Sequence, residues 1–252
     1  MDYPIRTLAL IILLFISGIS QTRAQANLSK WQVGINGGMF VYQGDLAPSD
    51  IGSYKTVQPA FGFYISRVLN PSLLLRTNLA LGRLSGNDAK YNNPAWRQQR
   101  GYQFSTPVAE LSELLVWNML GNNSNQLGQR FSPYVFGGLG VGFLNISRDT
   151  SNFNTHYFPA GSNIVNGLRA DMSRKPPGAA LVVPLGIGME FYLMPKISLT
   201  AETSFRYTFT DRIDGFSLGA NPGKKDFYHS HTIGLLYRFG KGNQMGCPVV
   251  PR

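Results

Sequence analysis

The chain has 252 residues and a formal net charge of +10, yet only 14% of its residues are charged, well below the quarter or so that is typical of soluble domains. Its Lys and Arg residues are scattered along the chain, so the basic balance does not form the stripe that a nucleic-acid footprint requires. Cys247 is the single cysteine, which excludes an internal disulfide.

The first residues have the features of an export signal. Arg6 precedes an apolar run from Leu8 to Ile19, and small residues follow at Ala24 and Ala26. A charged start, a short apolar run and an A-x-A-like exit are typical of a signal peptide, and the run is too short for a membrane-spanning helix of about 20 residues. We therefore expect residues 1–24 to be removed, with cleavage after Ala24 or Ala26.

The remaining chain alternates apolar and polar residues at period two, which is typical of strands with two different faces. The segments that show this pattern are 31–43, 57–67, 73–84, 104–118, 132–145, 180–193, 197–209 and 230–240. The run at 180–193 is longer than an ordinary strand of about 5–6 residues and matches the 9–11 residues of a tilted transmembrane strand. Segment 104–118 is irregular, because Leu111 and Leu114 cannot share a face without a bulge and Glu110 and Glu113 cannot both point inward.

The connectors between these segments indicate how the strands are joined. The first, third, fifth and seventh connectors are long, whereas the second and sixth are tight. Outer-membrane barrels have an even number of strands, short periplasmic turns and longer extracellular loops. The sequence therefore predicts an eight-stranded antiparallel outer-membrane β-barrel over residues 25–240, with both termini periplasmic and a periplasmic tail at 241–252. Aromatic residues near the strand ends are typical of interfacial girdles: Trp31, Tyr42, Trp117, Tyr134, Tyr192 and Tyr237.

The opening of the first strand resembles a known family. Residues 31–38 (WQVGINGG) lead to Tyr42-Gln43-Gly44-Asp45-Leu46, and similar matches continue through 59–62, 69–71, 75–78 and 82–88. This stretch resembles the PorG-like barrels of the type IX (Por) secretion system, most densely over residues 31–90. The resemblance implies a barrel of the secretion and gliding machinery that is associated with a periplasmic ring built from a lipoprotein and its partner.

An eight-stranded barrel has a lumen just wide enough to be filled by side chains. Five ionisable residues fall on the inward face of the predicted strands: Arg76, Glu190, Glu202, Arg206 and Arg238. Because an unpaired charge in a confined lumen is costly, we expect these residues to form a structural ionic network. This network would make the protein neither a channel nor an enzyme with a catalytic carboxylate pair.

The segment Tyr228-His229-Ser230-His231 suggests an alternative, a lipid-modifying barrel enzyme. A serine nucleophile needs a histidine within hydrogen-bond reach, but on a strand Ser230 points away from the face that His229 and His231 share. No metal-ligand spacing, phosphate loop or nucleotide fingerprint is present, so we expect no catalytic, cofactor or metal site.

Other features of the sequence indicate partners. Gly44, Asp45 and Leu46 suit the first extracellular turn, and loop 146–177 is either a solvated loop or, with its aromatic residues, a docking surface. The basic balance is consistent with outer-membrane lipid and lipopolysaccharide. Cys247 is either an unpaired thiol or a partner contact.

The sequence therefore favours a non-enzymatic outer-membrane barrel of the type IX machinery that anchors periplasmic ring proteins. The alternatives are the lipid-modifying enzyme and a general structural or adhesion barrel.

Overall fold

A computed structural model describes residues 30–47, 51–123, 130–220 and 225–239. The expected signal peptide, the tail at 241–252 and Cys247 lie outside these residues. Within them, no helix is both long enough and apolar enough to cross a membrane.

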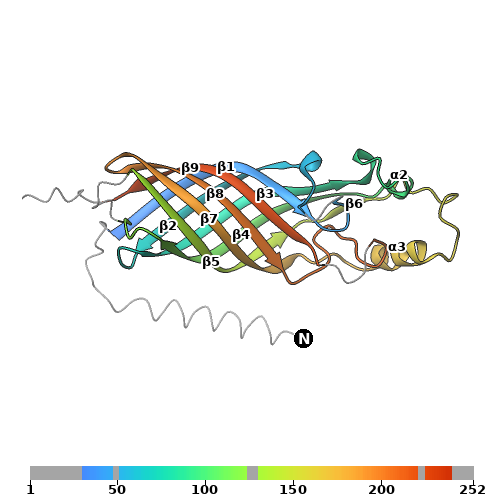
Figure 1. Ribbon diagram of the computed structural model, residues 1–252. Helices are drawn as coiled ribbons and strands as arrows, with labels where there is room; N and C mark the ends of the chain where they lie inside the picture. The colour runs from blue at the N-terminus through green and yellow to red at the C-terminus, as the bar shows by residue number, and fades with distance from the viewer. Residues whose placement is uncertain (1–29, 48–50, 124–129, 221–224, 240–252) are drawn as a thin grey trace, which may run out of the picture.

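Eight long antiparallel strands form one closed sheet (Figure 1). They are β1 (Trp31–Gln43), β2 (Gln58–Val68), β3 (Leu73–Asn87), β4 (Gln103–Asn118), β5 (Phe131–Leu144), β7 (Ala179–Met194), β8 (Ile197–Thr208) and β9 (Phe227–Arg238). Each strand pairs with its neighbours in the chain, and β1 also pairs with β9. The β3–β4 pairing, from Leu73↔Trp117 to Asn87↔Gln103, completes the ring. The predicted eight-stranded barrel is confirmed, and no edge is left among these strands.

Period-two alternation explains why the strands form this wall. Along β7, Leu181, Leu185, Ile187 and Met189 are exposed on the outside, whereas Glu190 is buried on the inside. The pairing between neighbouring strands keeps outward residues beside outward residues, as in the register Ile187↔Thr203. The same alternation continues around the barrel and gives an apolar outer wall.

Strand β4 is regular, and its apparent irregularity has a simple cause. Glu110 and Leu114 are buried inside the barrel, whereas Leu111 and Glu113 face outward. The inward face carries apolar as well as polar side chains, because the lumen of a small barrel is a packed core. No bulge is needed, and the two glutamates lie on opposite faces.

The aromatic girdle is smaller than the sequence suggested. Tyr42, Tyr134 and Tyr192 are buried on the inner face, at 7% exposure or less. Trp117 and Tyr237 do face outward, at 50% and 40% exposure. Proximity to a strand end therefore did not predict the face of the strand on which three of these rings lie.

The two ends of the barrel differ (Figure 1). At one end, the turn end, lie the start of β1, the end of β9 and the turns that join β2 to β3 and β7 to β8. At the other, the cap end, lie the long connectors, which contain η2 (Tyr54–Thr56), η3 (Asp88–Lys90), α2 (Trp96–Arg100), β6 (Ser147–Asp149) and α3 (Asn163–Ser173). The short strand β6 pairs with the cap end of β4.

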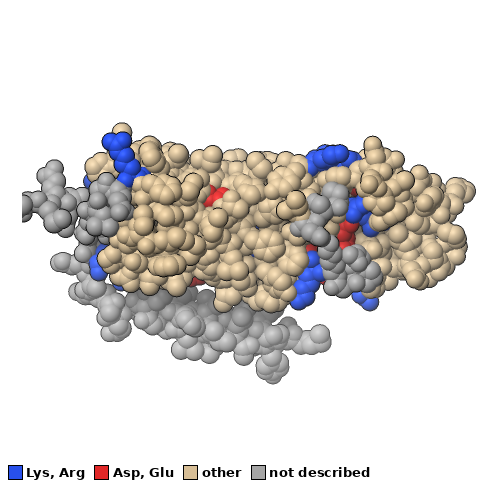
Figure 2. Space-filling view, viewed as in Figure 1, with Lys and Arg blue, Asp and Glu red and all other residues tan. Residues whose placement is uncertain are grey.

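The charges on the surface follow this division. Figure 2 shows Lys and Arg gathered near the two ends, with a wall between them that is almost free of charge. Exposed residues of the wall include large apolar side chains such as Ile35, Phe61, Leu139, Leu185 and Ile233, each at least 54% exposed. An apolar band between two polar rims is the arrangement expected of a barrel that faces lipid.

Candidate functional site

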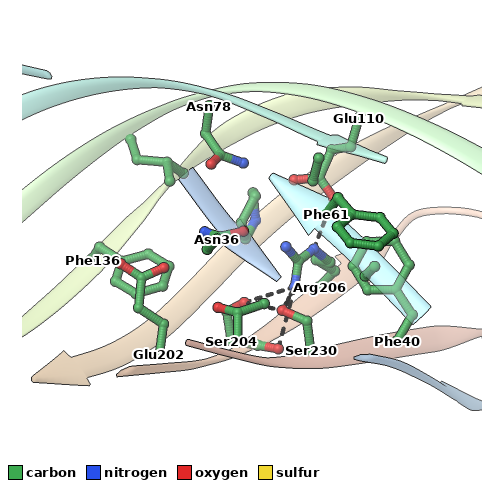
Figure 3. Close-up of a pocket in the computed structure, with 15 residues that line it drawn as sticks. Asn36, Phe40, Phe61, Asn78, Glu110, Phe136, Glu202, Ser204, Arg206 and Ser230 are labelled. Atoms are coloured by element: carbon green, nitrogen blue, oxygen red, sulfur yellow. Dashed lines mark hydrogen bonds and ion pairs between the residues drawn. The ribbon is translucent and has the colours of Figure 1, made fainter. Parts of the chain in front are cut away.

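The centre of the lumen is held by an ion pair between β4 and β8 (Figure 3). Arg206 donates from Nε to Glu110 Oε2 over 2.8 Å and from Nη1 to the hydroxyls of Ser204 and Ser230 over 2.6 and 2.7 Å. Glu110 Oε2 also accepts a 2.7 Å hydrogen bond from the Tyr228 hydroxyl. Both ionic groups are therefore satisfied by several partners, which offsets the cost of burying them.

Two further ion pairs lie nearer the turn end. Arg76 Nη1 is 2.6 Å from Glu202 Oε1, which also accepts a hydrogen bond of the same length from the Tyr134 hydroxyl. Arg238 pairs with Glu190 and donates to Ser198 Oγ.

The structure thus places all five sequence-predicted lumen residues inside the barrel, where four of them form two ion pairs and Arg206 pairs with a further residue. Sequence analysis did not assign a partner to Arg206, because it left open which glutamate of β4 points inward. Glu110 is that partner. An unambiguous strand phase for β4 would have identified it.

Little space remains between these side chains. The cavity beside Arg206 has a volume of about 20 Å³, and the one beside Arg76 about 10 Å³. A water molecule needs about 10–15 Å³ measured in this way, so each cavity holds about one water. The described side chains therefore fill these two parts of the lumen to within about one water molecule each.

The turn end is covered by the connector after β4. Asn122 and Asn123 are buried there, and their backbone carbonyls accept hydrogen bonds from Tyr192 Oη and Gln32 Nε2 over 2.7 and 3.1 Å. Asn123 also donates from Nδ2 to the carbonyl of Asn70. These hydrogen bonds connect the segment to β1, to β7 and to the turn between β2 and β3 at the turn end.

The cap end is closed by a second packed region that joins four connectors. Its apolar centre includes Tyr102 stacked on Phe216 at 4.5 Å between ring centroids. Asp88 binds Arg100 through both carboxylate oxygens, at 2.6 and 2.8 Å, and also contacts Arg97. The buried Asp88 carboxylate is therefore paired with two arginines.

Loop 146–177 belongs to this packed region. Asp171, at the end of α3, accepts hydrogen bonds from the backbone N–H groups of residues 217–219. Arg148 donates from Nη1 to the carbonyls of Asp171 and Gly215 over 2.6 and 3.1 Å. Asp171 and Arg148 therefore anchor the loop to the cap, whereas Tyr157 within it is 53% exposed.

The Gly44-Asp45-Leu46 turn connects β1 to this region. Asp45 and Leu46 are buried, and the Arg100 guanidinium donates to the backbone carbonyl of Asp45. A side chain at Gly44 would collide with the carboxylate of Asp226 and with the ring of Tyr42. The Gly44-Asp45-Leu46 motif, which is part of the family resemblance, therefore connects the barrel to the cap through buried contacts.

Two carboxyl groups meet beneath that turn. The Tyr42 hydroxyl is 2.6 Å from Asp214 Oδ2 and 3.0 Å from Asp226 Oδ1. Burial raises the pKa of Asp214 to about 7, and burial together with the Asp214 charge raises the pKa of Asp226 well above its ordinary value. Because a hydroxyl carries a single proton, a protonated carboxyl allows both contacts to be hydrogen bonds.

The side chains of the segment from His229 to His231 alternate between the outer and the inner face of the wall. Ser230 points into the lumen and contacts Arg206, whereas His229 and His231 are on the outside. Both imidazoles place Nε2 3.2 Å from the hydroxyl of Tyr54, which comes from η2. As expected from the strand geometry, neither histidine is positioned to activate Ser230.

A second polar pair on the outer wall involves Glu113. Its Oε2 accepts a 2.7 Å hydrogen bond from the hydroxyl of Thr77, and Leu75, Leu79, Leu111 and Leu115 are exposed along the same two strands. A carboxylate on a lipid-facing wall is unfavourable, so the Thr77–Glu113 pair is a polar exception among apolar neighbours.

The described residues contain no group of His, Cys, Asp and Glu arranged to hold a metal ion. The expected absence of a cofactor remains a prediction.

Comparison with known proteins places the chain in a family without an assigned activity. The sequence profile described as "Domain of unknown function (DUF6089)" matches residues 6–244. No curated protein matches the chain.

Several solved structures are similar. The attachment invasion locus protein Ail of Yersinia pestis, in complex with a heparin analogue, shows 12% identity over 83% of this chain and 97% of its own, at a TM-score of 0.45. Neisserial surface protein A shows 13% identity over the same shares, at 0.44. A major outer membrane protein of Thermus thermophilus shows 13% identity over 83% of this chain and 99% of its own, at 0.42. The barrel fold is established by the strand pairing of the chain itself.

Proposed function

The chain belongs to the DUF6089 family, and we propose that it is a non-enzymatic outer-membrane barrel that anchors periplasmic ring proteins of the type IX secretion machinery. The observation that carries this proposal is the filled lumen. A barrel whose interior is occupied by paired charges and closed at both ends acts through its surfaces, not through a pore.

The apolar wall supports an outer-membrane location. Its exposed Leu, Ile and Phe side chains form the band between two rims that carry Lys and Arg. Basic residues at a membrane interface are attracted to anionic lipid headgroups. We assign the cap end to the extracellular side, where its cations face lipopolysaccharide, because long connectors are extracellular in such barrels.

The turn end then faces the periplasm and supplies the anchoring surface. Four exposed cations, Lys30, Arg67, Arg130 and Lys196, lie there, and the described residues of this end have no exposed acidic side chain. Leu69 and other large apolar side chains are exposed beside them. Exposed cations beside exposed apolar side chains suit binding to a partner protein whose contact surface is apolar at its centre and acidic at its rim.

The resemblance of residues 31–90 to PorG-like barrels supplies the identity of the partner. It implies a lipoprotein and the protein with which that lipoprotein forms a periplasmic ring. The tail at 241–252, with Cys247, follows β9, whose last residue is at the turn end, and is a second candidate contact.

Affinity purification in mild detergent from the native cells tests this function. Wild type should retain the ring lipoprotein and its partner, whereas a variant with Arg67→Glu and Lys196→Glu should lose them. Lys90→Glu, a charge reversal at the cap end, is the matched control and should retain them. Recovery of no ring protein with wild type, or equal recovery with both variants, would contradict the proposal.

A deletion strain separates the anchoring function from a structural or adhesion role. Loss of secreted type IX cargo is the expected result. Normal cargo secretion would favour the structural or adhesion barrel instead.

A further inference from the structure

A polar cluster occupies the outer wall where β8 and β9 pair. Thr203 Oγ1 is 3.1 Å from His231 Nδ1, and His231 Nε2 is 3.2 Å from the Tyr54 hydroxyl. The same hydroxyl is 3.2 Å from His229 Nε2. Hydrogen bonds therefore connect four polar side chains on a surface that is otherwise apolar.

The cluster lies in the cap-side half of the wall, where Tyr54 of η2 meets β9. His231 is four residues from Phe227, the first residue of β9, which corresponds to ~13 Å along the strand. Its outward neighbours across the two pairings are Met39 and Thr203. Ionisable groups at membrane depth are rare and mark functional sites.

An apolar groove begins at this cluster. It has a volume of about 600 Å³, within the usual range of ligand sites, and both His231 and Thr203 line it. Gly37 and Ala201 leave room for the groove because they carry little or no side chain, and Met189 and Ile233 also line it.

The groove crosses the wall obliquely, away from the cap end. Strand pairing connects Gly37 to Ile233, Ile233 to Ala201, and Ala201 to Met189. The groove continues to Met119 beside the turn end. At about 4.8 Å per strand, the five steps from β1 to the connector after β4 span ~24 Å, which suits an extended chain better than a compact ligand.

The lining also indicates the polar group of the ligand. Its polar side chains include His231 and Thr203 at the cap side and Glu202, which is paired with Arg76, but no Lys or Arg is among the described lining residues. A phosphate would favour such cations, whereas an ester or hydroxyl group needs only neutral hydrogen-bonding partners.

We propose that the groove between β1, β9, β8 and β7 binds one acyl chain of an outer-leaflet lipid, whose ester or hydroxyl group hydrogen-bonds to His231 and Thr203. The chain runs from this polar end toward Met189. Tyr54 is a positioning residue that holds the imidazole of His231 from the cap side. The inference rests on the membrane location proposed above.

Native mass spectrometry of the detergent-purified barrel tests the groove, with lipid A and phosphatidylethanolamine as probes. Ala201→Leu fills the groove and should lower lipid A binding at least ten-fold. Ala109→Leu adds the same side chain to the outer face of β4, away from the groove, and should bind like wild type. Equal binding by both variants, or equal loss from both, would overturn the proposal.

A second variant that fills the groove tests whether the loss of binding is caused by a folding defect. Gly37→Val meets only Phe61, at ordinary contact distances of 3.7 and 3.8 Å, and should reproduce the loss while retaining the folded mobility shift on unheated gels. Wild-type lipid A binding by folded Gly37→Val would contradict the site.

Two further measurements test the polar contact with the ligand and the membrane leaflet from which the lipid comes. Thr203→Val, which removes one hydrogen bond, should weaken lipid A binding about five-fold, and unchanged affinity would contradict the polar contact. Binding of phosphatidylethanolamine in preference to lipid A would contradict an outer-leaflet source. Absence of the protein from the outer-membrane fraction would instead refute the membrane location, so the two failures are distinguishable.

Discussion

Replacing Glu110 by Gln removes one charge from the centre of the lumen while keeping the shape of the side chain. Glu110 is fully buried and accepts hydrogen bonds from Arg206 Nε, Tyr228 Oη and Ser112 Oγ at 2.8, 2.7 and 3.2 Å. In the variant, the Arg206 guanidinium keeps its charge but retains only hydroxyl and carbonyl partners.

The magnitude follows from the hydrogen bonds that the Glu110 carboxylate accepts. Hydrogen bonds to charged groups contribute about 1.5–3 kcal/mol each, and Glu110 receives two strong ones, from Arg206 and Tyr228. Removing one partner of a buried ion pair costs about 3–5 kcal/mol. We therefore expect Glu110→Gln to lower the free energy of unfolding by about 3–5 kcal/mol.

Urea unfolding of the barrel in lipid vesicles, followed by tryptophan fluorescence, measures this change. Glu113→Gln is the matched control on the same strand, because Glu113 faces outward and removal of its charge from the lipid-facing wall should not lower stability. The double variant Glu110→Leu with Arg206→Met removes both charges and should recover most of the loss. A cost for Glu110→Gln no larger than that for Glu113→Gln would refute the lumen ion pair.

Three further predictions concern the cap and the wall. Gly44→Ala forces a methyl group against Asp226 and should make the cap sensitive to protease, whereas Gly178→Ala, which meets nothing within 4 Å, should not. Because burial raises the pKa of Asp214 from 3.8 to about 7, its contribution to cap stability is fully present below pH 3.8 and is lost as the pH rises through 7. The raised pKa of Asp226 acts in the same direction, so protease resistance of the cap should fall as the pH rises, and Asp226→Asn should flatten the dependence. Glu113→Leu removes a carboxylate from the wall and should stabilise the isolated barrel by about 1–2 kcal/mol in vesicle unfolding; an unchanged or lower stability would show that the wall at this position does not face lipid.

The strands were predictable because each crosses the wall with alternating faces. Segment 31–43 matches β1 at both ends, and segment 230–240 differs from β9 by three residues at its start and two at its end. Prediction was weakest on β4, where Leu114 packs inside the barrel against Val116 and Phe136. When both faces of a strand are apolar, period two no longer identifies the inner one.

The cap was not predictable from local pattern. Its order depends on contacts between residues far apart in the chain, such as Arg148 with Gly215 and Asp171 with the 217–219 backbone. The His229–Tyr54 contact has the same character, since it joins positions 175 residues apart. Alternation placed His229 on the outer face, but only the folded connector shows what covers it.

Conductance across a planar lipid bilayer tests most directly the claim that this barrel is filled and acts through its surfaces. We predict that purified wild-type protein, inserted and folded, carries no steady ionic current at physiological salt. A stable, ohmic single-channel current from folded wild-type protein would contradict this claim, because the paired charges and the closed ends leave no continuous path for ions.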